Sequence, residues 1–371
     1  SFSSGGLTVG STTLTIIGSN GNIGIGTTTP ESRLQVVGNI MNTASSRFNP
    51  VLVGDEGGNN GYRQIVISGK YAYGLGGGDF LKTFDISTST PSLISKVSTA
   101  GTDSESRALA VSGRYAYIGN YSRFYVFDIS NPSSPTTTGS VGTDQKIMSI
   151  AVSGRYAYAV TGINSSHFLV IDISNPSSPI VVSSLLGAGG SSVFVSGRYA
   201  YIVDTNVIKT IDISNPSSPI VTGSATTGST PAGVYVSGKY AYVVNQTSSS
   251  LNIFDISTSS PALVASTTTL LTPTSIFVSG RYAYTVNITA PQSLQVFDVY
   301  NPIAPGSVGS VLLGSVVNPA SVFVSGRYAY VVGGNSGGGV NVFDISGLET
   351  TSAIVHSLEA GNLQVRNDII A

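Results

Sequence analysis

The stretch Ser112-Gly113-Arg114-Tyr115-Ala116-Tyr117, followed by Phe127-Asp128-Ile129, decides the fold because the chain carries seven versions of it. The glycines of successive Ser-Gly-Arg/Lys-Tyr-Ala-Tyr copies are 44, 41, 43, 41, 42 and 46 residues apart. These glycines are Gly69, Gly113, Gly154, Gly197, Gly238, Gly280 and Gly326. A period of roughly 40–45 residues predicts an array of like structural units.

Each repeat predicts four short strands, which the third copy shows clearly. Its strand-like segments are 149–152, 155–160, 168–173 and 180–182, rich in β-branched and aromatic residues and bounded by Gly, Pro and Asn. The Ser153-Gly154 step between the first two fits a two-residue hairpin turn. Seven units of four strands predict an all-β fold, a seven-bladed β-propeller of four-stranded antiparallel blades. A solenoid is the alternative, but the repeats keep their length well and no distinct capping repeats are evident.

The repeat also resembles a known family. Leu169-Val170-Ile171-Asp172 and Phe127-Asp128-Ile129-Ser130-Asn131-Pro132 are similar to the LVIVD-type repeat of bacterial and archaeal surface propellers. The resemblance covers about residues 62–358. It implies a propeller and says little about the ligand.

Composition excludes several classes of function. Only 9% of the 371 residues are charged, the net charge is −1, and the chain has 0 Cys and 2 His. We therefore expect no disulfide framework, no thiol catalysis, no metal or other cofactor and no affinity for nucleic acid. No apolar run of about 18 residues occurs, so no membrane insertion is expected.

The repeated charges are expected to be structural. Each repeat has one cation at the start of its second strand and one aspartate near the end of its third, and these ends lie opposite each other in an antiparallel pair. We predict one cross-strand ion pair per blade, with Ala116 beside Val126 when Arg114 pairs with Asp128. A ring of catalytic carboxylates is the alternative. The cations are Lys70, Arg114, Arg155, Arg198, Lys239, Arg281 and Arg327, and the aspartates are Asp85, Asp128, Asp172, Asp212, Asp255, Asp298 and Asp344.

The Tyr-Ala-Tyr triplets contain 14 of the 19 tyrosines. Alternation along a strand places both rings of a triplet on one face, where we expect them to pack against the neighbouring blade. A sugar-stacking surface is the alternative.

The loops at one end of the predicted ring, which join strand B to strand C and each blade to the next, differ in sequence between repeats. They carry most of the charges that do not repeat. Variation among repeats marks positions released from the shared structural role, and loops on one face are where repeat proteins usually bind. All of these charges fall in the first four blades, and only repeated charges occur between 213 and 324. The candidate binding residues are Tyr62, Arg63, Asp79, Asp103, Glu105, Arg107, Tyr121, Arg123, Asp144 and Lys146.

Two further groups of residues are weaker signals. His167 and His356 have unlike contexts and are expected to be strand residues without a catalytic role. Four Asn-X-Ser/Thr sequences are expected in loops of the variable end, and whether they carry glycans stays open. They begin at Asn120, Asn164, Asn245 and Asn287.

The two ends of the chain differ from the repeats. We expect a β-structured stalk over 1–46, the propeller over 47–358 and a resumed stalk over 359–371. Ile23-Gly24-Ile25-Gly26-Thr27-Thr28-Thr29-Pro30 resembles a motif of β-structured shafts in phage tail fibres and long bacterial surface proteins. That resemblance implies a homo-oligomer, a trimer or a filament.

Eight segments compete for seven outermost strands. Both 49–54 and Thr351–Leu358 have the pattern of an outermost strand. Either the N-terminal segment completes the last blade, or the C-terminal segment does and 49–54 is a linker.

These features predict a non-enzymatic propeller, extracellular and displayed at a cell surface or on a fibre. It would act in adhesion or structural assembly, binding a surface protein or glycan through its variable face. A glycan-binding module of lectin type is the alternative, and a propeller hydrolase is a third. The chain is expected to be a fragment of something longer.

Overall fold

The computed structural model describes residues 61–76, 79–99, 106–162, 166–314, 316, 318–334 and 339–345, together with strands at 7–9, 12–17, 22–25, 34–36 and 51–56. The chain divides into two units, Ser1–Arg47 and Phe48–Ala371. In the first unit, strands β1 (Leu7–Val9), β2 (Thr12–Ile17), β3 (Asn22–Ile25) and β4 (Leu34–Val36) form one sheet in that order. Its first two pairings are antiparallel and the third is parallel.

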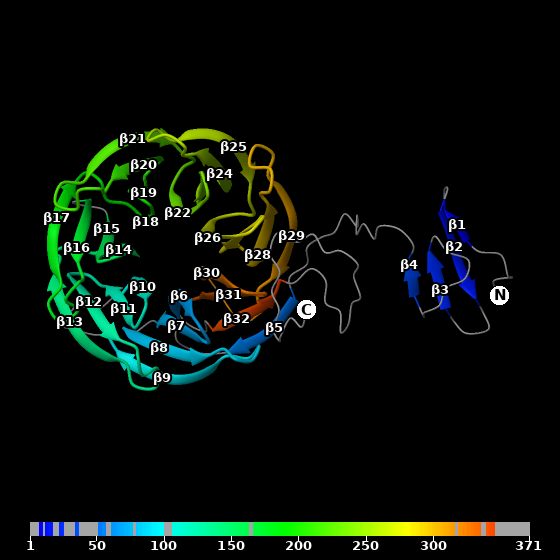
Figure 1. Cartoon of the computed structure of the whole chain (residues 1–371), viewed down its shortest axis with the longest axis horizontal. Coiled ribbons are helices and arrows are strands. Elements are labelled where there is room, and N and C mark those ends of the chain that lie inside the picture. Colours follow the sequence, from blue (N-terminus) through cyan, green and yellow to red (C-terminus); the bar gives the residue numbers. More distant parts are fainter. Residues whose placement is uncertain are drawn as a thin grey trace, which may run out of the picture. The chain divides into compact units, whose positions relative to one another are not determined.

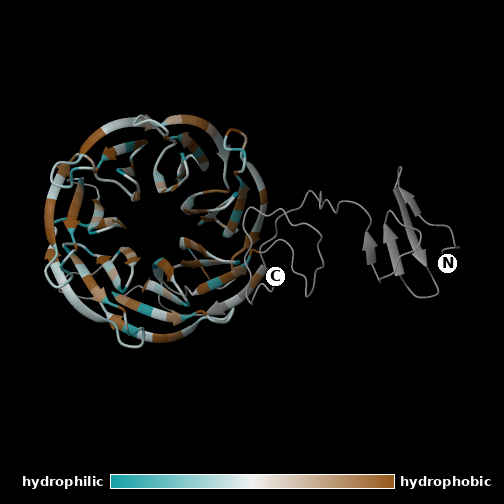
Figure 2. Cartoon of the chain, viewed as in Figure 1, coloured by the Kyte–Doolittle hydropathy of each residue, from teal (hydrophilic) through white to brown (hydrophobic). Residues whose placement is uncertain are grey.

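The second unit confirms the predicted seven-bladed propeller. Seven four-stranded antiparallel sheets surround a central axis, and the described part of the chain contains strands and turns but no helix (Figure 1). We call the strands of each blade A to D from the axis outward. Hydrophobic segments occur on strands of every layer (Figure 2).

The A strands lie nearest the axis and the B strands pack outside them. The A strands are β6 (Tyr62–Ser68), β10 (Ala108–Ser112), β14 (Ile147–Ser153), β18 (Ser192–Ser196), β22 (Pro231–Ser237), β26 (Pro273–Ser279) and β30 (Pro319–Ser325). The B strands are β7 (Tyr71–Gly76), β11 (Tyr115–Gly119), β15 (Tyr156–Thr161), β19 (Tyr199–Asp204), β23 (Tyr240–Asn245), β27 (Tyr282–Asn287) and β31 (Tyr328–Gly333).

The C and D strands complete each blade toward the outside. The C strands are β8 (Phe80–Asp85), β12 (Arg123–Asp128), β16 (His167–Asp172), β20 (Val207–Asp212), β24 (Ser250–Asp255), β28 (Ser293–Asp298) and β32 (Val340–Asp344). The D strands are β9 (Ser92–Ser98), β13 (Thr136–Gly142), β17 (Ile180–Leu186), β21 (Ile220–Thr226), β25 (Ala262–Thr268), β29 (Gly306–Leu312) and β5 (Val51–Glu56).

The N-terminal strand closes the ring. Strand β5 pairs antiparallel with β32, so it is the D strand of blade 7, while blade 1 begins at β6. This resolves the choice between the two candidate outermost strands in favour of the N-terminal one. The rival segment, Thr351–Leu358, lies outside the described residues.

The core lies between blades, as the Tyr-Ala-Tyr pattern predicts. Seven hydrophobic clusters are buried, and each joins two neighbouring blades, including blade 7 with blade 1. The second tyrosine of each triplet belongs to one of these clusters. Tyr73 of blade 1, for example, is 3% exposed and packs with Leu109 and Phe127 of blade 2. The predicted role of these tyrosines is confirmed.

The A–B turn differs by one residue from the prediction. Ser112 pairs with Tyr115, so the two turn residues are Gly113 and Arg114 rather than Ser and Gly. Gly113 has φ +57°, as the first turn position of a type II′ hairpin requires. Because the B strand therefore begins at Tyr115, which pairs with Asp128, Ala116 lies opposite Phe127 and not Val126.

Candidate functional site

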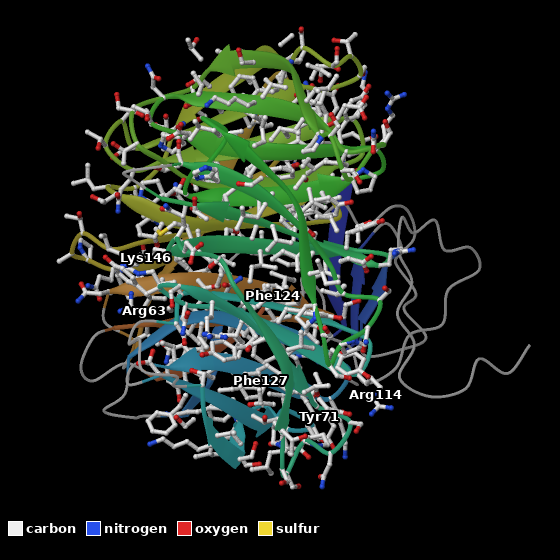
Figure 3. All side chains as sticks on the ribbon, turned by 90° about the vertical axis from the view of Figure 1, so that its left-hand side faces the viewer. Arg63, Tyr71, Arg114, Phe124, Phe127 and Lys146 are labelled. Carbon is white, nitrogen blue, oxygen red and sulfur yellow. The ribbon has the colours of Figure 1, made fainter. Side chains whose placement is uncertain are left out.

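The repeated ion pairs lie at the end of the ring that carries the A–B and C–D turns. Figure 3 shows Arg114 and Tyr71 at that end and Arg63 and Lys146 at the other. All seven predicted pairs form, with Nζ–Oδ2 distances of 3.9 Å for Lys70–Asp85 and 3.5 Å for Lys239–Asp255. The other pairs are Arg114–Asp128, Arg155–Asp172, Arg198–Asp212, Arg281–Asp298 and Arg327–Asp344. This is the structural role that the sequence predicted.

Each pair is part of a larger local arrangement. Asp128 also accepts the backbone N–H of Ser130 at 2.9 Å, which fixes the start of the C–D turn. The hydrogen bond from Arg114, then those from Ser130, lower the pKa of Asp128 to about 2. The Arg114 guanidinium lies 5.3 Å from the Tyr115 ring centroid. The Asp128 carboxylate is therefore held ionised, and its oxygens bond to Arg114 and to the C–D turn.

A pocket at the variable end collects four of the ten candidate binding residues. Arg107, Tyr121, Asp144 and Lys146 line a cavity of about 350 Å³, together with Gln145, Met148 and Gly162. We call it the blade 2–3 pocket. Tyr121 comes from the B–C loop of blade 2, while Asp144 and Lys146 come from the connection between β13 and β14.

Local structure explains why Tyr121 points outward. The buried side chain of Asn120 accepts the N–H groups of Ser122 at 3.1 Å and Arg123 at 2.8 Å, which closes a tight turn. Tyr121 lies at the tip of this turn and is 55% exposed. The Lys146 ammonium lies 5.0 Å from its ring centroid, a cation–π contact.

Other candidate residues have roles within the fold. Tyr62 is 1% exposed and lies in strand β6, and its hydroxyl accepts a hydrogen bond from Lys82 at 2.9 Å. Asp79 is 9% exposed and accepts the N–H of Ser106 at 2.7 Å. Tyr62 and Asp79 therefore offer little surface to a ligand.

The remaining candidates are dispersed. Arg123 begins strand β12 and donates to the Ser140 hydroxyl at 3.2 Å. Arg63 lines the central channel rather than the blade 2–3 pocket. Asp103 and Glu105 lie outside the described residues.

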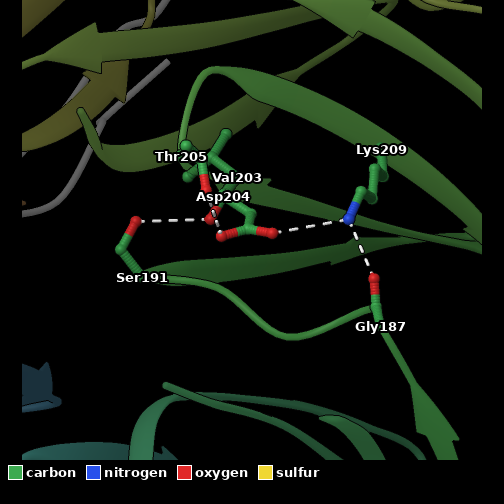
Figure 4. Close-up of polar contacts among 6 residues, drawn as sticks. All are labelled: Gly187, Ser191, Val203, Asp204, Thr205 and Lys209. Atoms are coloured by element: carbon green, nitrogen blue, oxygen red, sulfur yellow. Dashed lines mark hydrogen bonds and ion pairs between the residues drawn. The ribbon is translucent and has the colours of Figure 1, made fainter. Parts of the chain in front are cut away.

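Charges of blade 4 are also used internally. Lys209 donates to the Gly187 carbonyl at 2.9 Å and lies 3.4 Å from the Asp204 carboxylate, while Thr205 donates to the same carboxylate at 3.1 Å (Figure 4). These contacts tie the D–A connection before β18 to the blade that follows it.

Three of the four glycosylation sequences are buried. The side chains of Asn120, Asn245 and Asn287 are each 0% exposed, and the latter two end strands β23 and β27. A glycan on any of them would require local unfolding. Asn164 and His356 lie outside the described residues, and His167 begins strand β16 as expected.

The central channel was missed by sequence reasoning. Its cavity, of about 420 Å³, is lined by the A strands of all seven blades. Four aromatic side chains line one side, from blades 4 to 7: Phe194, Tyr235, Phe277 and Phe323. The signal was present in the repeats, because the equivalent residues of blades 1 to 3 are Val66, Ala110 and Ala151.

Neither a cluster of metal ligands nor a membrane-spanning helix occurs among the described residues. Those residues hold no group of three or more His, Cys, Asp or Glu placed to bind a metal ion. In the same residues no helix has the length and hydrophobicity needed to cross a membrane.

Solved structures share the fold at low identity. The Cps50 β-propeller domain of Myceliophteria thermophila matches with a TM-score of 0.65 at 10% identity, over 80% of this chain and 100% of that one. The computationally designed protein Ika8 matches with a TM-score of 0.58 at 13% identity, over 79% of this chain and 99% of that one. A putative 6-phosphogluconolactonase of Bacteroides fragilis matches with a TM-score of 0.59 at 15% identity, over 82% of this chain and 92% of that one. These likenesses concern the fold alone.

The family is established by the repeats themselves. No curated protein matches the chain. The LVIVD repeat family matches at residues 104–143, 145–186, 189–227, 230–269, 273–312 and 318–348, which together make up more than half of the chain. With seven blades built on the same motif, the chain belongs to the LVIVD-repeat family of β-propellers.

Proposed function

We propose that this propeller is a non-enzymatic binding module that acts outside the cell, in adhesion or structural assembly, through its variable face. The observation that carries the proposal is the blade 2–3 pocket. An exposed tyrosine, a lysine, an arginine and an aspartate surround one cavity there, on a surface that differs from repeat to repeat. The seven repeated aspartates are not available for chemistry in this scheme because they hold the turns.

Tyr121 is the expected anchor of the partner. Tyrosine is enriched at binding sites because it offers a large, rigid contact area together with a polar hydroxyl. Arg107, Asp144 and Lys146 around it would add charged hydrogen bonds. A partner surface of mixed charge fits this arrangement.

The test is binding of the labelled 371-residue chain to cell-surface preparations, followed by flow cytometry. Tyr121→Ala combined with Lys146→Ala should lower binding about tenfold or more, as loss of an anchor does. Tyr300→Ala is the matched control, because Tyr300 is 79% exposed in a C–D turn at the opposite end. Loss of binding in the control but not in the double variant would exclude the variable face.

A glycan is the second candidate partner. The specific observation in its favour is that the exposed Tyr121 ring lies beside Lys146 and Asp144, since sugar rings stack on aromatic faces while their hydroxyls bond to charged groups. A glycan array separates the two. Selective sugar binding that is lost in Tyr121→Ala would favour the lectin, and no sugar binding would leave a protein partner.

We propose further that copies associate through the stalk segments as a trimer or a filament. The mass of the intact particle by light scattering tests this. A monomeric mass would exclude it.

A further inference from the structure

A second cavity on the variable face adjoins the blade 2–3 pocket. It has a volume of about 570 Å³, and Met148 and Gly162 line both cavities. We call it the blade 3–4 pocket. A Cβ on Gly162 would lie 2.8 Å from Cγ of Met148, so the two cavities meet where the chain has no room for a larger residue. Together they form one groove, which we call the variable-face groove.

The blade 3–4 pocket is lined mainly by hydroxyl groups. Its other lining residues come from, or lie beside, the B–C loops of blades 3 and 4 and the connections that lead into blades 4 and 5. They are Ser166, Gly190, Ser191, Asp204, Thr205, Thr230 and Pro231. Among the described residues of this lining only Asp204 carries a charge, and the ammonium group of Lys209, 3.4 Å away, balances it (Figure 4). The pocket is therefore polar without a net charge.

Two of these hydroxyls already use their hydrogens inside the protein. Ser191 donates to the carbonyl of Pro231 at 2.6 Å, and Thr205 donates to the Asp204 carboxylate at 3.1 Å. A hydroxyl that has donated its single hydrogen keeps lone pairs that accept hydrogen bonds, and a carboxylate only accepts. The pocket therefore presents acceptors, which suit an uncharged ligand rich in O–H donors.

An extended peptide suits the blade 3–4 pocket less well. Peptides that bind in extended form pair their main chain with unpaired backbone groups. In the connections that line this pocket, the N–H of Gly190 already donates to the carbonyl of Thr161 at 3.1 Å. The N–H of Thr230 likewise donates to the carbonyl of Thr205 at 3.0 Å. A sugar needs no such backbone groups, because its hydroxyls bond to side chains.

We propose that the variable-face groove binds a linear, uncharged oligosaccharide along its length. One sugar ring lies against the exposed Tyr121 in the blade 2–3 pocket, and the chain continues past Met148. A further ring then donates its hydroxyls to Ser191, Asp204 and Thr205. This inference rests on the proposed function, because it uses the same Tyr121 anchor, and it adds a second subsite and a ligand class to that site.

The test is a glycan array probed with the labelled 371-residue chain. The array carries linear oligomers of glucose, N-acetylglucosamine, mannose and galactose, from monosaccharides to hexasaccharides. Binding to at least one series is expected, with an affinity that rises about tenfold or more from the disaccharide to the tetrasaccharide as the second subsite fills. No binding to any series, or equal affinity for the disaccharide and the tetrasaccharide, would overturn the proposal.

Variants in the blade 3–4 pocket locate the second subsite. Thr205→Gly removes a hydroxyl at an exposed residue with φ +46°, a conformation that glycine adopts without strain, and Ser191→Ala removes another. The double variant should lower tetrasaccharide affinity about tenfold, to that of the disaccharide, with disaccharide affinity retained. Thr205→Gly alone should lower it in part, which provides a test if the double variant does not fold.

The matched control removes a hydroxyl from another blade of the same face. Thr289→Ala serves, because Thr289 is exposed in the B–C loop of blade 6 and its hydroxyl bonds to that of Thr272 at 2.6 Å. Its tetrasaccharide affinity should match that of the native chain. An equal loss in this control, or native affinity in Thr205→Gly and in the double variant, would remove the sugar from the blade 3–4 pocket.

The cell-surface assay separates failure of this inference from failure of the proposed function. If no oligosaccharide binds but Tyr121→Ala with Lys146→Ala still lowers cell binding, the oligosaccharide is excluded and the proposed function stands with a protein partner. If that variant binds cells as well as the native chain does, the proposed function fails, and the inference that rests on it fails too.

Discussion

At the residue scale, the aspartate of each repeat has a structural role that its position alone suggests. Asp212 pairs with Arg198 and accepts the N–H of Ser214 at 2.9 Å, so one carboxylate joins the B strand to the C–D turn. The arginine side chain is 61% exposed, and exposed pairs contribute modestly to stability one at a time. The ion pairs stabilise the ring through their number, because the same pair occurs in all seven blades.

The variant Asp212→Ala should lower the melting temperature and leave partner binding unchanged. The reason is that blade 4 loses the ion pair and the bond to Ser214, both far from the variable face. Melting is followed by circular dichroism. If the variant abolished binding while its melting temperature stayed native, the aspartate would have a functional rather than a structural role.

Stability should fall in acid. In the folded chain the pKa values of Asp128, Asp172 and Asp212 are about 2, below the roughly 3.9 of an unfolded aspartate. A lowered folded pKa contributes stability that is complete above the unfolded pKa and is lost as the pH falls toward the folded one. We expect the melting temperature to decline between about pH 5 and pH 2. A flat profile over that range would contradict the ion-pair assignment.

At the element scale, the D strands of several blades pack on the C–D turn of the next blade through a small residue. A Cβ on Gly223 would lie 2.2 Å from the carbonyl oxygen of Ser259, and one on Gly139 would lie 2.4 Å from that of Pro176. Where this position is Ser95, its hydroxyl donates to the carbonyl of Pro132 at 2.8 Å. The outer edge of the ring therefore depends on small residues as much as on the aromatic clusters inside.

The variant Gly223→Val should destabilise the ring by about 1–3 kcal/mol, the usual cost of overpacking. The valine side chain would meet backbone that cannot move without displacing the turn of blade 5. Gly306→Val is the control, because a Cβ there meets nothing within 4 Å. Chemical denaturation measures both, and equal stability of the two variants would exclude the proposed packing.

Strand positions and their antiparallel order were largely predictable from the sequence, whereas the exact register of the pairing was not. The Tyr-Ala-Tyr and Asp-containing segments mark the B and C strands because each combines β-branched or aromatic residues with a turn. The one-residue error at Arg114 arose because both Ser-Gly and Gly-Arg can form a two-residue turn, and only the pairing of Ser112 with Tyr115 decides between them.

The candidate site was predictable only in part. Residues that break the repeat, three charged and one aromatic, pointed to Arg107, Asp144, Lys146 and Tyr121, which line one pocket. Burial of Tyr62 and Asp79 depends on the partner strands and loops, which no local pattern shows. The channel depends on all seven A strands at once, so its shape was not visible in any single repeat.

At the scale of the whole molecule, the ring is held closed by the two ends of the domain. Blade 7 takes three strands from the C-terminal repeat and its D strand, β5, from the residues before blade 1. Gly54 of this strand packs in turn on the C–D turn of blade 1, since a Cβ there would lie 1.8 Å from the Ser89 carbonyl oxygen. The N-terminal strand thus contacts both the last blade and the first.

The measurement that tests this account most directly compares two shortened chains by thermal unfolding. A chain that begins at Phe48 retains β5 and should melt as a closed ring, close to the 371-residue chain. A chain that begins at Gly57 lacks β5, exposes the edge of β32 and loses a blade contact, so it should melt at a clearly lower temperature or fail to fold. Equal melting of the two chains would contradict closure by the N-terminal strand.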